Sequence, residues 1–130
     1  KALFIPLVID LIATGVLMNA EAPEPFNTLI ENALSKARFA AKHTGLPSIA
    51  DDAGLCVDAF NGLPGVQTAF YATQFGYAKS DANNVRALLE QMQGINNRKA
   101  SMVSTLVGVR HEDDPEPLIA VGNVQVEIAT

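Results

Sequence analysis

The chain has 130 residues and a formal net charge of −5, and it is 48% hydrophobic, 18% charged and 6% aromatic. This length suffices for one domain with a buried core, and the hydrophobic fraction excludes a disordered or collagen-like chain. The acidic balance argues against a surface that neutralises a nucleic-acid backbone, and the single cysteine excludes an intrachain disulfide. We therefore expect one globular domain in the cytoplasm, with no nucleic-acid or membrane partner.

The first apolar run, residues 2–18, follows a basic residue and precedes small residues, which is the pattern of a secretory signal peptide. Asp10 inside the run argues against a leader or a span, because a carboxylate in lipid costs about 2.5–3.5 kcal/mol. We instead expect the end of a helix over residues 1–7 and a short buried strand over residues 8–13. Secretion, with cleavage near Ala22, is the alternative.

A polar loop with two prolines, residues 19–25, precedes the strongest helical pattern. Apolar side chains recur at three- and four-residue spacing over residues 26–41 and form one stripe. Thr28 and Glu31 have the spacing of a capping box, and Gly45 favours the end of the helix. A helix is therefore predicted from this loop to Gly45.

Two polar residues of this helix, Asn32 and Lys36, are four positions apart at the edge of the apolar stripe. Residues with this spacing share one face of a helix, so both are predicted to point into a cleft beside the core. Lys36 is a candidate for holding a phosphate. The alternative is a surface lysine that buries only its stem.

Two short strands are predicted over residues 47–50 and 55–60, joined by a turn at residues 51–54. Asp51 and Asp52 then lie at a strand end, where α/β proteins bind their ligands. Neighbouring carboxylates suit Mg²⁺ together with a substrate phosphate, and one of them can take a proton from an attacking water. The alternative is an acidic pair that only caps the turn.

Other candidate groups have a plainer interpretation beside the functional one. Glu21 and Glu24 in the polar loop are either a further oxygen ligand or simply solvated. Cys56, in an apolar strand, is interpreted as a core residue rather than a nucleophile. Neither histidine has a partner at metal-ligand spacing, and neither common glycine-rich phosphate loop occurs in the sequence.

The second half of the chain predicts a helix and a hairpin. An irregular segment at residues 67–79 is followed by a helix over about 81–93. Its predicted buried face consists of Val85, Leu88, Leu89 and Met92. Two β-rich runs, 102–110 and 118–128, predict a hairpin whose acidic connection, 111–117, is expected to be solvated. Helices interleaved with strands indicate the α/β class.

Several of these segments match known family motifs in order and spacing. Residues 28–41 correspond to the pattern TFxENAxxKAxxAA, and residues 50–55 correspond to ADDSGL. Residues 62–65 with Tyr71 are similar to GxPGxxSARY, and residues 107–117 are similar to LVxxRHxxDPxP. On these motifs, which span most of the chain, the sequence resembles the Ham1/inosine triphosphate pyrophosphatase family.

The resemblance implies a mixed twisted β-sheet flanked by helices, with two lobes around a central cleft, in a protein that is usually a homodimer. It also implies a Mg²⁺-dependent hydrolase. Its substrates would be the non-canonical purine nucleoside triphosphates ITP, dITP and XTP, cleaved to the monophosphate and pyrophosphate. Such an enzyme removes deaminated nucleotides from the pool.

The resemblance also implies a role for each matching site residue. Asp52 would be the general base and a metal ligand, and Glu24 would be the second metal carboxylate. Lys36 would contact the triphosphate or the base of the nucleotide. The remaining positions expected in substrate binding are Asn32, Asp51 and Ala53.

The sequence departs from the family pattern at several points. The family opens with a phosphate loop of the type [ST]-x-N-x-x-K and ends with GFGYDP and Ser-His-Arg segments, so residues 1–130 are expected to form a single domain that lacks both. Ala53 replaces a serine of the family, which removes a hydroxyl but keeps the backbone N–H, and Phe70 replaces an arginine. The alternative function is therefore a degenerate, non-catalytic relative that binds a nucleotide or a partner subunit.

Overall fold

The computed structural model describes residues 12–13 and 24–130. The elements, in chain order, are α2 (Leu29–Thr44), β1 (Ser48–Val57), η2 (Asp58–Phe60), η3 (Gly65–Phe75), α3 (Asp81–Gln91), β2 (Lys99–Val109) and β3 (Leu118–Glu127). The helix end predicted over residues 1–7 lies outside the described residues. So does the strand predicted over residues 8–13, except for Ile12 and Ala13, which are exposed and in neither helix nor strand.

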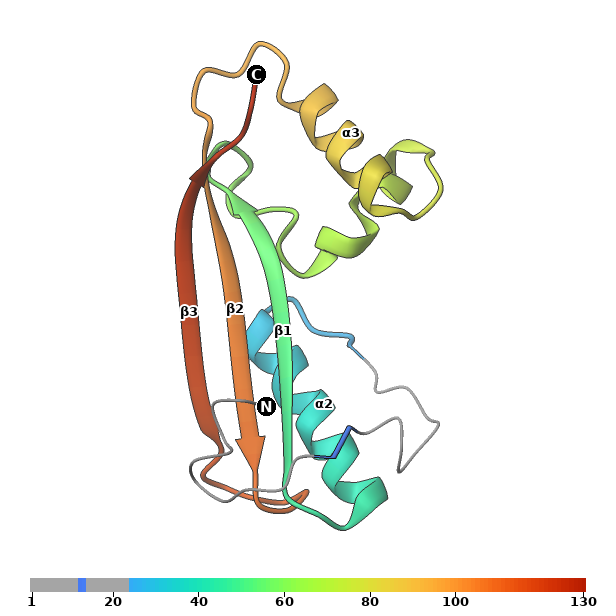
Figure 1. The fold of residues 1–130 in the computed structure, drawn as a ribbon, viewed down its shortest axis with the longest axis vertical. Helices are drawn as coiled ribbons and strands as arrows, with labels where there is room; N and C mark the ends of the chain where they lie inside the picture. The colour runs from blue at the N-terminus through green and yellow to red at the C-terminus, as the bar shows by residue number, and fades with distance from the viewer. Residues whose placement is uncertain (1–11, 14–23) are drawn as a thin grey trace.

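The sheet consists of three strands in the order β1-β2-β3, which lie along the long axis of the molecule (Figure 1). The predicted hairpin is confirmed, because β2 pairs antiparallel with β3 from Lys99 to Gly108. The α/β class is confirmed as well. Both described pairings are antiparallel, so the parallel pairing that a mixed sheet needs does not occur in the part of the chain that the structure describes.

Strand β1 corrects the prediction of two short strands around a turn. It runs from Ser48 to Val57 and pairs with β2 at every residue, so the predicted turn is the middle of a strand. Gly54, which belongs to the predicted turn, is a glycine because of a packing contact. A methyl group at this position would clash with the carbonyl oxygen of Gly65 and crowd Thr68 Oγ1. The glycine therefore serves the close approach of η3 to β1.

We expect Gly54→Ala to lower the free energy of unfolding by about 1–3 kcal/mol, because the added methyl forces η3 away from β1. Gly122→Ala is the matched control. A methyl there meets only Ser104 O, at 4.0 Å, so its stability should stay close to that of the parent protein. Urea denaturation of both variants measures the difference, and equal midpoints would contradict the assigned role of Gly54.

Helix α2 begins and ends where the sequence predicts. Thr28 Oγ1 accepts a hydrogen bond from the Glu31 N–H at 3.2 Å and donates to the Glu31 carboxylate at 2.7 Å. Gly45, with a φ of 68°, ends the helix in the left-handed conformation that glycine adopts without strain. The small side chains of α2 pack against β2 in a core formed by Ala33, Ala37, Ala41, Val107 and Val109.

Helix α3 also starts as predicted, because Ser80 Oγ accepts the Asn83 N–H at 3.0 Å. Its buried face is only partly as expected. Leu88 and Met92 are buried, whereas Val85 is 58% exposed and Leu89 is also exposed. The segment predicted as irregular is largely the helix η3, which packs with α3 in a second core of Val57, Tyr71, Ala72, Ala87, Leu88, Met92 and Ala100.

The two cores lie at opposite ends of the sheet (Figure 1) and, by the alternation of strand side chains, on opposite faces. α2 covers the face that carries Ala50 and Val107, and α3 covers the face that carries Val57 and Ala100. Beyond α3 the latter face is open. Its exposed large apolar residues are Ile49, Met102, Leu106, Leu118 and Val124.

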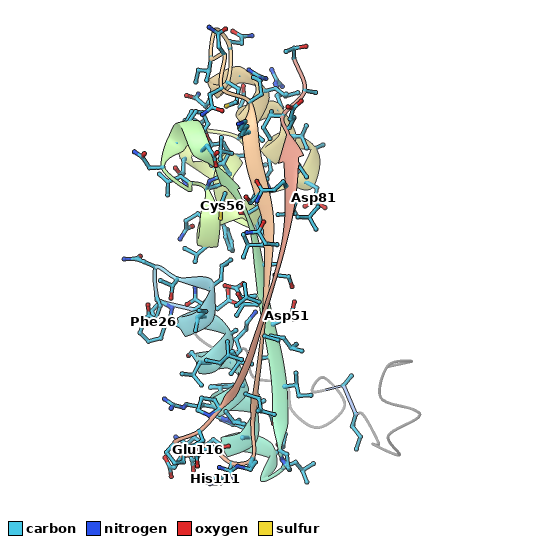
Figure 2. The ribbon with its side chains drawn as sticks, turned by 90° about the vertical axis from the view of Figure 1, so that its left-hand side faces the viewer. Phe26, Asp51, Cys56, Asp81, His111 and Glu116 are labelled. Atoms are coloured by element: carbon cyan, nitrogen blue, oxygen red, sulfur yellow. The ribbon has the colours of Figure 1, made fainter. Side chains whose placement is uncertain are left out.

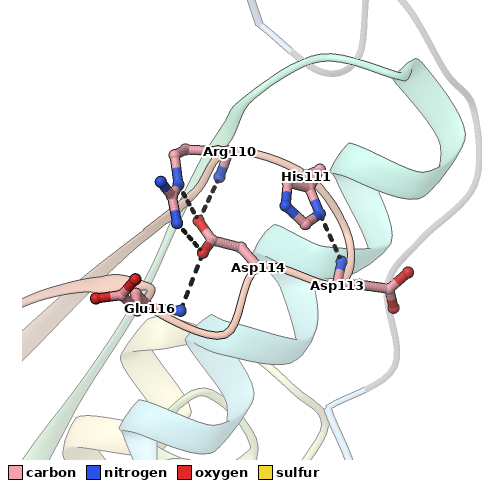
Figure 3. Close-up of polar contacts among 5 residues, drawn as sticks. All are labelled: Arg110, His111, Asp113, Asp114 and Glu116. Carbon is pink, nitrogen blue, oxygen red and sulfur yellow. Dashed lines mark hydrogen bonds and ion pairs between the residues drawn. The ribbon is translucent and has the colours of Figure 1, made fainter.

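The prediction that the acidic connection between β2 and β3 is solvated is wrong for one residue. Asp114 is only 1% exposed, and its carboxylate is bonded within the connection (Figure 3). Its Oδ2 accepts from the backbone N–H and Nε of Arg110, both at 2.9 Å, and its Oδ1 accepts from Arg110 Nη2 at 2.7 Å. The Glu116 N–H donates to the same carboxylate at 3.0 Å. These donors, the Arg110 side chain above all, hold the pKa of Asp114 well below its usual range.

We expect Asp114→Asn to lower the Tm at neutral pH by about 5 °C or more, because the hairpin loses a bidentate charged contact. Since the folded-state pKa is depressed, the stabilisation is present above the unfolded-chain value of 3.8 and disappears as the pH falls through the folded pKa. The difference in Tm between parent and variant should therefore shrink below pH 3.8. A difference that is constant down to the lowest pH at which both fold would contradict this account.

Candidate active site

Three charged side chains from separate segments converge beside the middle of β1. Lys36 Nζ on α2 lies 2.9 Å from Glu24 Oε1 in the preceding loop and 3.8 Å from Asp52 Oδ1 on β1. The Lys36 and Asp52 side chains are 27% and 16% exposed, and Glu24 is 43% exposed. The structure thus brings together the three residues to which the family resemblance assigns the central roles, with one ammonium group between two carboxylates.

Burial is the main influence on Asp52 and raises the pKa of its carboxyl above the ordinary value. The neighbouring charges act in opposite directions, since Lys36 lowers this pKa and Glu24 raises it. The Asn32 side chain and the Ala53 N–H also favour the ionised form. A carboxylate that is partly desolvated and only partly compensated is a good proton acceptor and a good ligand for a further cation.

Asn32 is buried, whereas the predicted role in substrate binding would need a side chain that the substrate can reach. Its Oδ1 accepts the Phe26 N–H at 3.0 Å, and its Nδ2 donates to the Phe26 carbonyl at 3.1 Å. Only 2% of the residue is exposed. The amide is therefore engaged with the protein's own backbone, although it lies one helical turn from Lys36 on the same face, as expected.

Asp51 and Asp52 do not form the joint site that their adjacency suggests. Successive side chains of a strand point to opposite faces, so Asp51 lies on the face away from α2, where it is exposed. Figure 2 shows Asp51 near the middle of the long sheet, far from either end. Ala53 lies on that same face and is exposed, and only its N–H is directed to the Asp52 carboxylate.

Sequence reasoning missed Thr105, which pairs directly with Asp52 across the sheet. It is 1% exposed, whereas its neighbours on the same face of β2 toward the strand end, Val107 and Val109, are apolar core residues. The signal in the sequence is weak, because the same run also contains Ser101 and Ser104. Its position opposite the half-buried carboxylate makes Thr105 part of the wall of the site.

The remaining candidates contribute little. Burial raises the pKa of the Cys56 thiol, which disfavours the reactive thiolate and agrees with a packing role. Glu21 lies outside the described residues. Residues 12–13 and 24–130 contain no cluster of three or more histidine, cysteine, aspartate or glutamate side chains that is placed to bind a metal ion. Among the same residues, no helix has both the length and the hydrophobicity of a membrane span. Any metal at Glu24 and Asp52 would need further oxygens from water or substrate.

Comparisons with a family model and with curated sequences point to the same family. Residues 5–130 match the model of the Ham1 family. The chain is 68% identical over 130 residues to a dITP/XTP pyrophosphatase of Paracidovorax citrulli and 68% identical over 130 residues to one of Delftia acidovorans. Each match covers 100% of this chain and 65% of the relative, so the chain spans slightly less than two thirds of the length of these curated relatives.

Solved structures agree with the sequence matches. A HAM1 protein from Coxiella burnetii superposes with a TM-score of 0.86 at 37% identity, covering 98% of this chain and 66% of the other. A nucleoside-triphosphatase described as a dITP/XTP pyrophosphatase, from Mycobacterium abscessus, superposes with a TM-score of 0.72 at 38% identity. It covers 86% of this chain and 56% of the other.

Proposed function

Because the chain belongs to the Ham1 family, we propose that it forms the catalytic part of a hydrolase that converts non-canonical purine nucleoside triphosphates to the monophosphate and pyrophosphate. The substrates would be dITP, ITP and XTP. The names of the relatives at 68% identity support this proposal. The single observation that carries it is the convergence of Glu24, Lys36 and Asp52 on one point beside β1.

We propose Asp52 as the general base. Its raised pKa makes it a stronger proton acceptor than an exposed aspartate, while the Lys36 ammonium at 3.8 Å keeps enough of it ionised to act. The carboxylate would take a proton from the water that attacks the α-phosphorus. The bond from that phosphorus to the bridging oxygen breaks, and pyrophosphate leaves with the electron pair.

The proposed cofactor is Mg²⁺, with Glu24 and Asp52 as its protein ligands. Two carboxylates that already face one ammonium group supply the hard oxygen donors that this ion prefers, and a site with one or two carboxylates is typical where substrate phosphates complete the coordination. When bound, the ion would neutralise charge on the phosphates. Lys36 would then be released from Glu24 to contact a phosphate oxygen.

We expect Lys36→Met to lower kcat/KM for dITP by about 10- to 100-fold, because a charged contact to the triphosphate is lost. Lys42→Met is the matched control, since Lys42 is exposed in the last turn of the same helix. Initial rates of pyrophosphate release measure both. Equal losses in the two variants would argue for a general effect of charge on α2.

The proposed activity is tested by pyrophosphate release from dITP, XTP and dGTP with and without Mg²⁺, in a protein that carries this chain at the full length of its relatives. We expect turnover of dITP and XTP that requires the metal and is much slower with dGTP. Binding of dITP without release of pyrophosphate would instead support the non-catalytic alternative.

The assembly and the location are proposals of the same kind. The homodimer is what the family resemblance implies, and the cytoplasmic location is what the composition and the single cysteine lead us to propose. The exposed apolar residues on the open face of the sheet, such as Leu118 and Val124, are compatible with cover by a second copy. Light scattering at several protein concentrations measures the oligomeric state, and a monomeric mass throughout would contradict the homodimer.

A further inference from the structure

We infer that Asn32 is a positioning residue that fixes Glu24 against Asp52, and that it is not a contact to the substrate; the inference rests on the proposed function of this site. Asn32 is one helical turn before Lys36 on α2. Its side chain is the link between the loop that carries Glu24 and the strand that carries Asp52.

The geometry supports this role on the side of the loop. Both polar groups of the Asn32 amide bond to one residue, Phe26, accepting from its N–H at 3.0 Å and donating to its carbonyl at 3.1 Å. This double contact fixes the peptide groups on both sides of Phe26, only two residues after Glu24. The loop has no helix or strand of its own at this point, so the amide supplies the restraint that secondary structure does not.

The same side chain acts on the side of the strand. The Asn32 side chain is also a hydrogen-bond partner of the Asp52 carboxylate. An amide nitrogen carries two hydrogens, so it can serve both the Phe26 carbonyl and this carboxylate. Only 2% of the residue is exposed, so the amide is largely shielded from solvent. One buried amide therefore sets the relative position of two carboxylates from different segments.

The chain contains a matched control for this arrangement. Asn84 on α3 accepts the Ala72 N–H at 2.9 Å and donates to the Ala69 carbonyl at 3.0 Å. It thus makes the same kind of double contact with a backbone segment, but beside the core at the other end of the sheet. Removing this amide costs comparable hydrogen bonds without altering the loop of Glu24.

The test compares Asn32→Ala with Asn84→Ala by two readouts that do not depend on turnover, the affinity for Mn²⁺ and the hydrogen exchange of backbone amides. In Asn32→Ala we expect the Mn²⁺ affinity to fall by about 10- to 100-fold and the Phe26 amide to exchange faster. In Asn84→Ala we expect faster exchange at Ala72 and an unchanged Mn²⁺ affinity.

The outcomes separate this inference from the proposed function. Unchanged Mn²⁺ affinity in a folded Asn32→Ala protein whose Phe26 amide exchanges faster would overturn the positioning role. A parent protein that does not bind Mn²⁺ at all would instead overturn the proposed metal site. Should Asn32→Ala fail to fold, Asn32→Ser keeps a buried polar atom that is too short to reach both Phe26 groups, and the same readouts and limits apply to it.

Discussion

Asp52→Asn is expected to lower kcat for pyrophosphate release by about 100-fold or more, because the amide cannot accept the proton of the attacking water. The variant should also be more stable than the parent protein at neutral pH. The folded protein holds a proton on Asp52 more tightly than the unfolded chain does. This contribution is present below the unfolded-chain value of 3.8 and disappears as the pH rises through the raised folded pKa. A neutral amide avoids that loss.

Loss of activity together with a higher Tm distinguishes a functional carboxylate from a structural one. Asp58→Asn is the control, because Asp58 is an exposed aspartate just after the same strand and has no part in the site. It should change neither the rate nor the Tm by much. A fully active Asp52→Asn protein would remove the assigned base, and a lower Tm at neutral pH would contradict the cause given for the raised pKa.

Glu24→Gln is expected to raise the Mg²⁺ concentration that gives half-maximal rate by about 10-fold or more, since one of two anionic ligands becomes neutral. The rate at saturating Mg²⁺ should fall less than in Asp52→Asn, because the proposed base is retained. Glu116→Gln removes the same charge from the distant hairpin connection and is the control. Identical Mg²⁺ dependence in the Glu24 variant and the parent would exclude Glu24 as a ligand.

Much of the local structure could be predicted from the sequence, because its causes are local. The cap at Thr28 and the left-handed Gly45 fix the ends of α2 through contacts within a few residues. The alternating pattern of β2 and β3 likewise predicts their pairing. These features need no knowledge of what packs against them.

The features that were wrong or missed depend on contacts between distant segments. Gly54 signals a turn by composition, yet the neighbour that requires a glycine is Gly65, in another element. The burial of Asp114 depends on two hydrogen bonds from the Arg110 guanidinium group. The number of charged residues in the connection does not reveal these bonds.

The candidate site divides in the same way. Helical spacing predicts that Asn32 and Lys36 share a face, and this is confirmed in the structure. The adjacency of Asp51 and Asp52 suggests a shared site only if the chain turns there. In a continuous strand the same adjacency sends the two carboxylates to opposite faces. The burial of Asn32 and its bonds to the Phe26 backbone could not be predicted, because the sequence does not show where the backbone of that loop lies.

The central claim, that Glu24 and Asp52 bind one divalent ion, is tested most directly by a double-mutant cycle on Mn²⁺ affinity. The parent protein, Glu24→Gln, Asp52→Asn and the double variant are compared by titration calorimetry. If both carboxylates hold the same ion, their contributions to binding should not be additive. The binding free energy lost in the double variant should then differ clearly from the sum of the losses in the two single variants. Strictly additive losses, or a double variant that binds Mn²⁺ as tightly as the parent, would contradict a shared site.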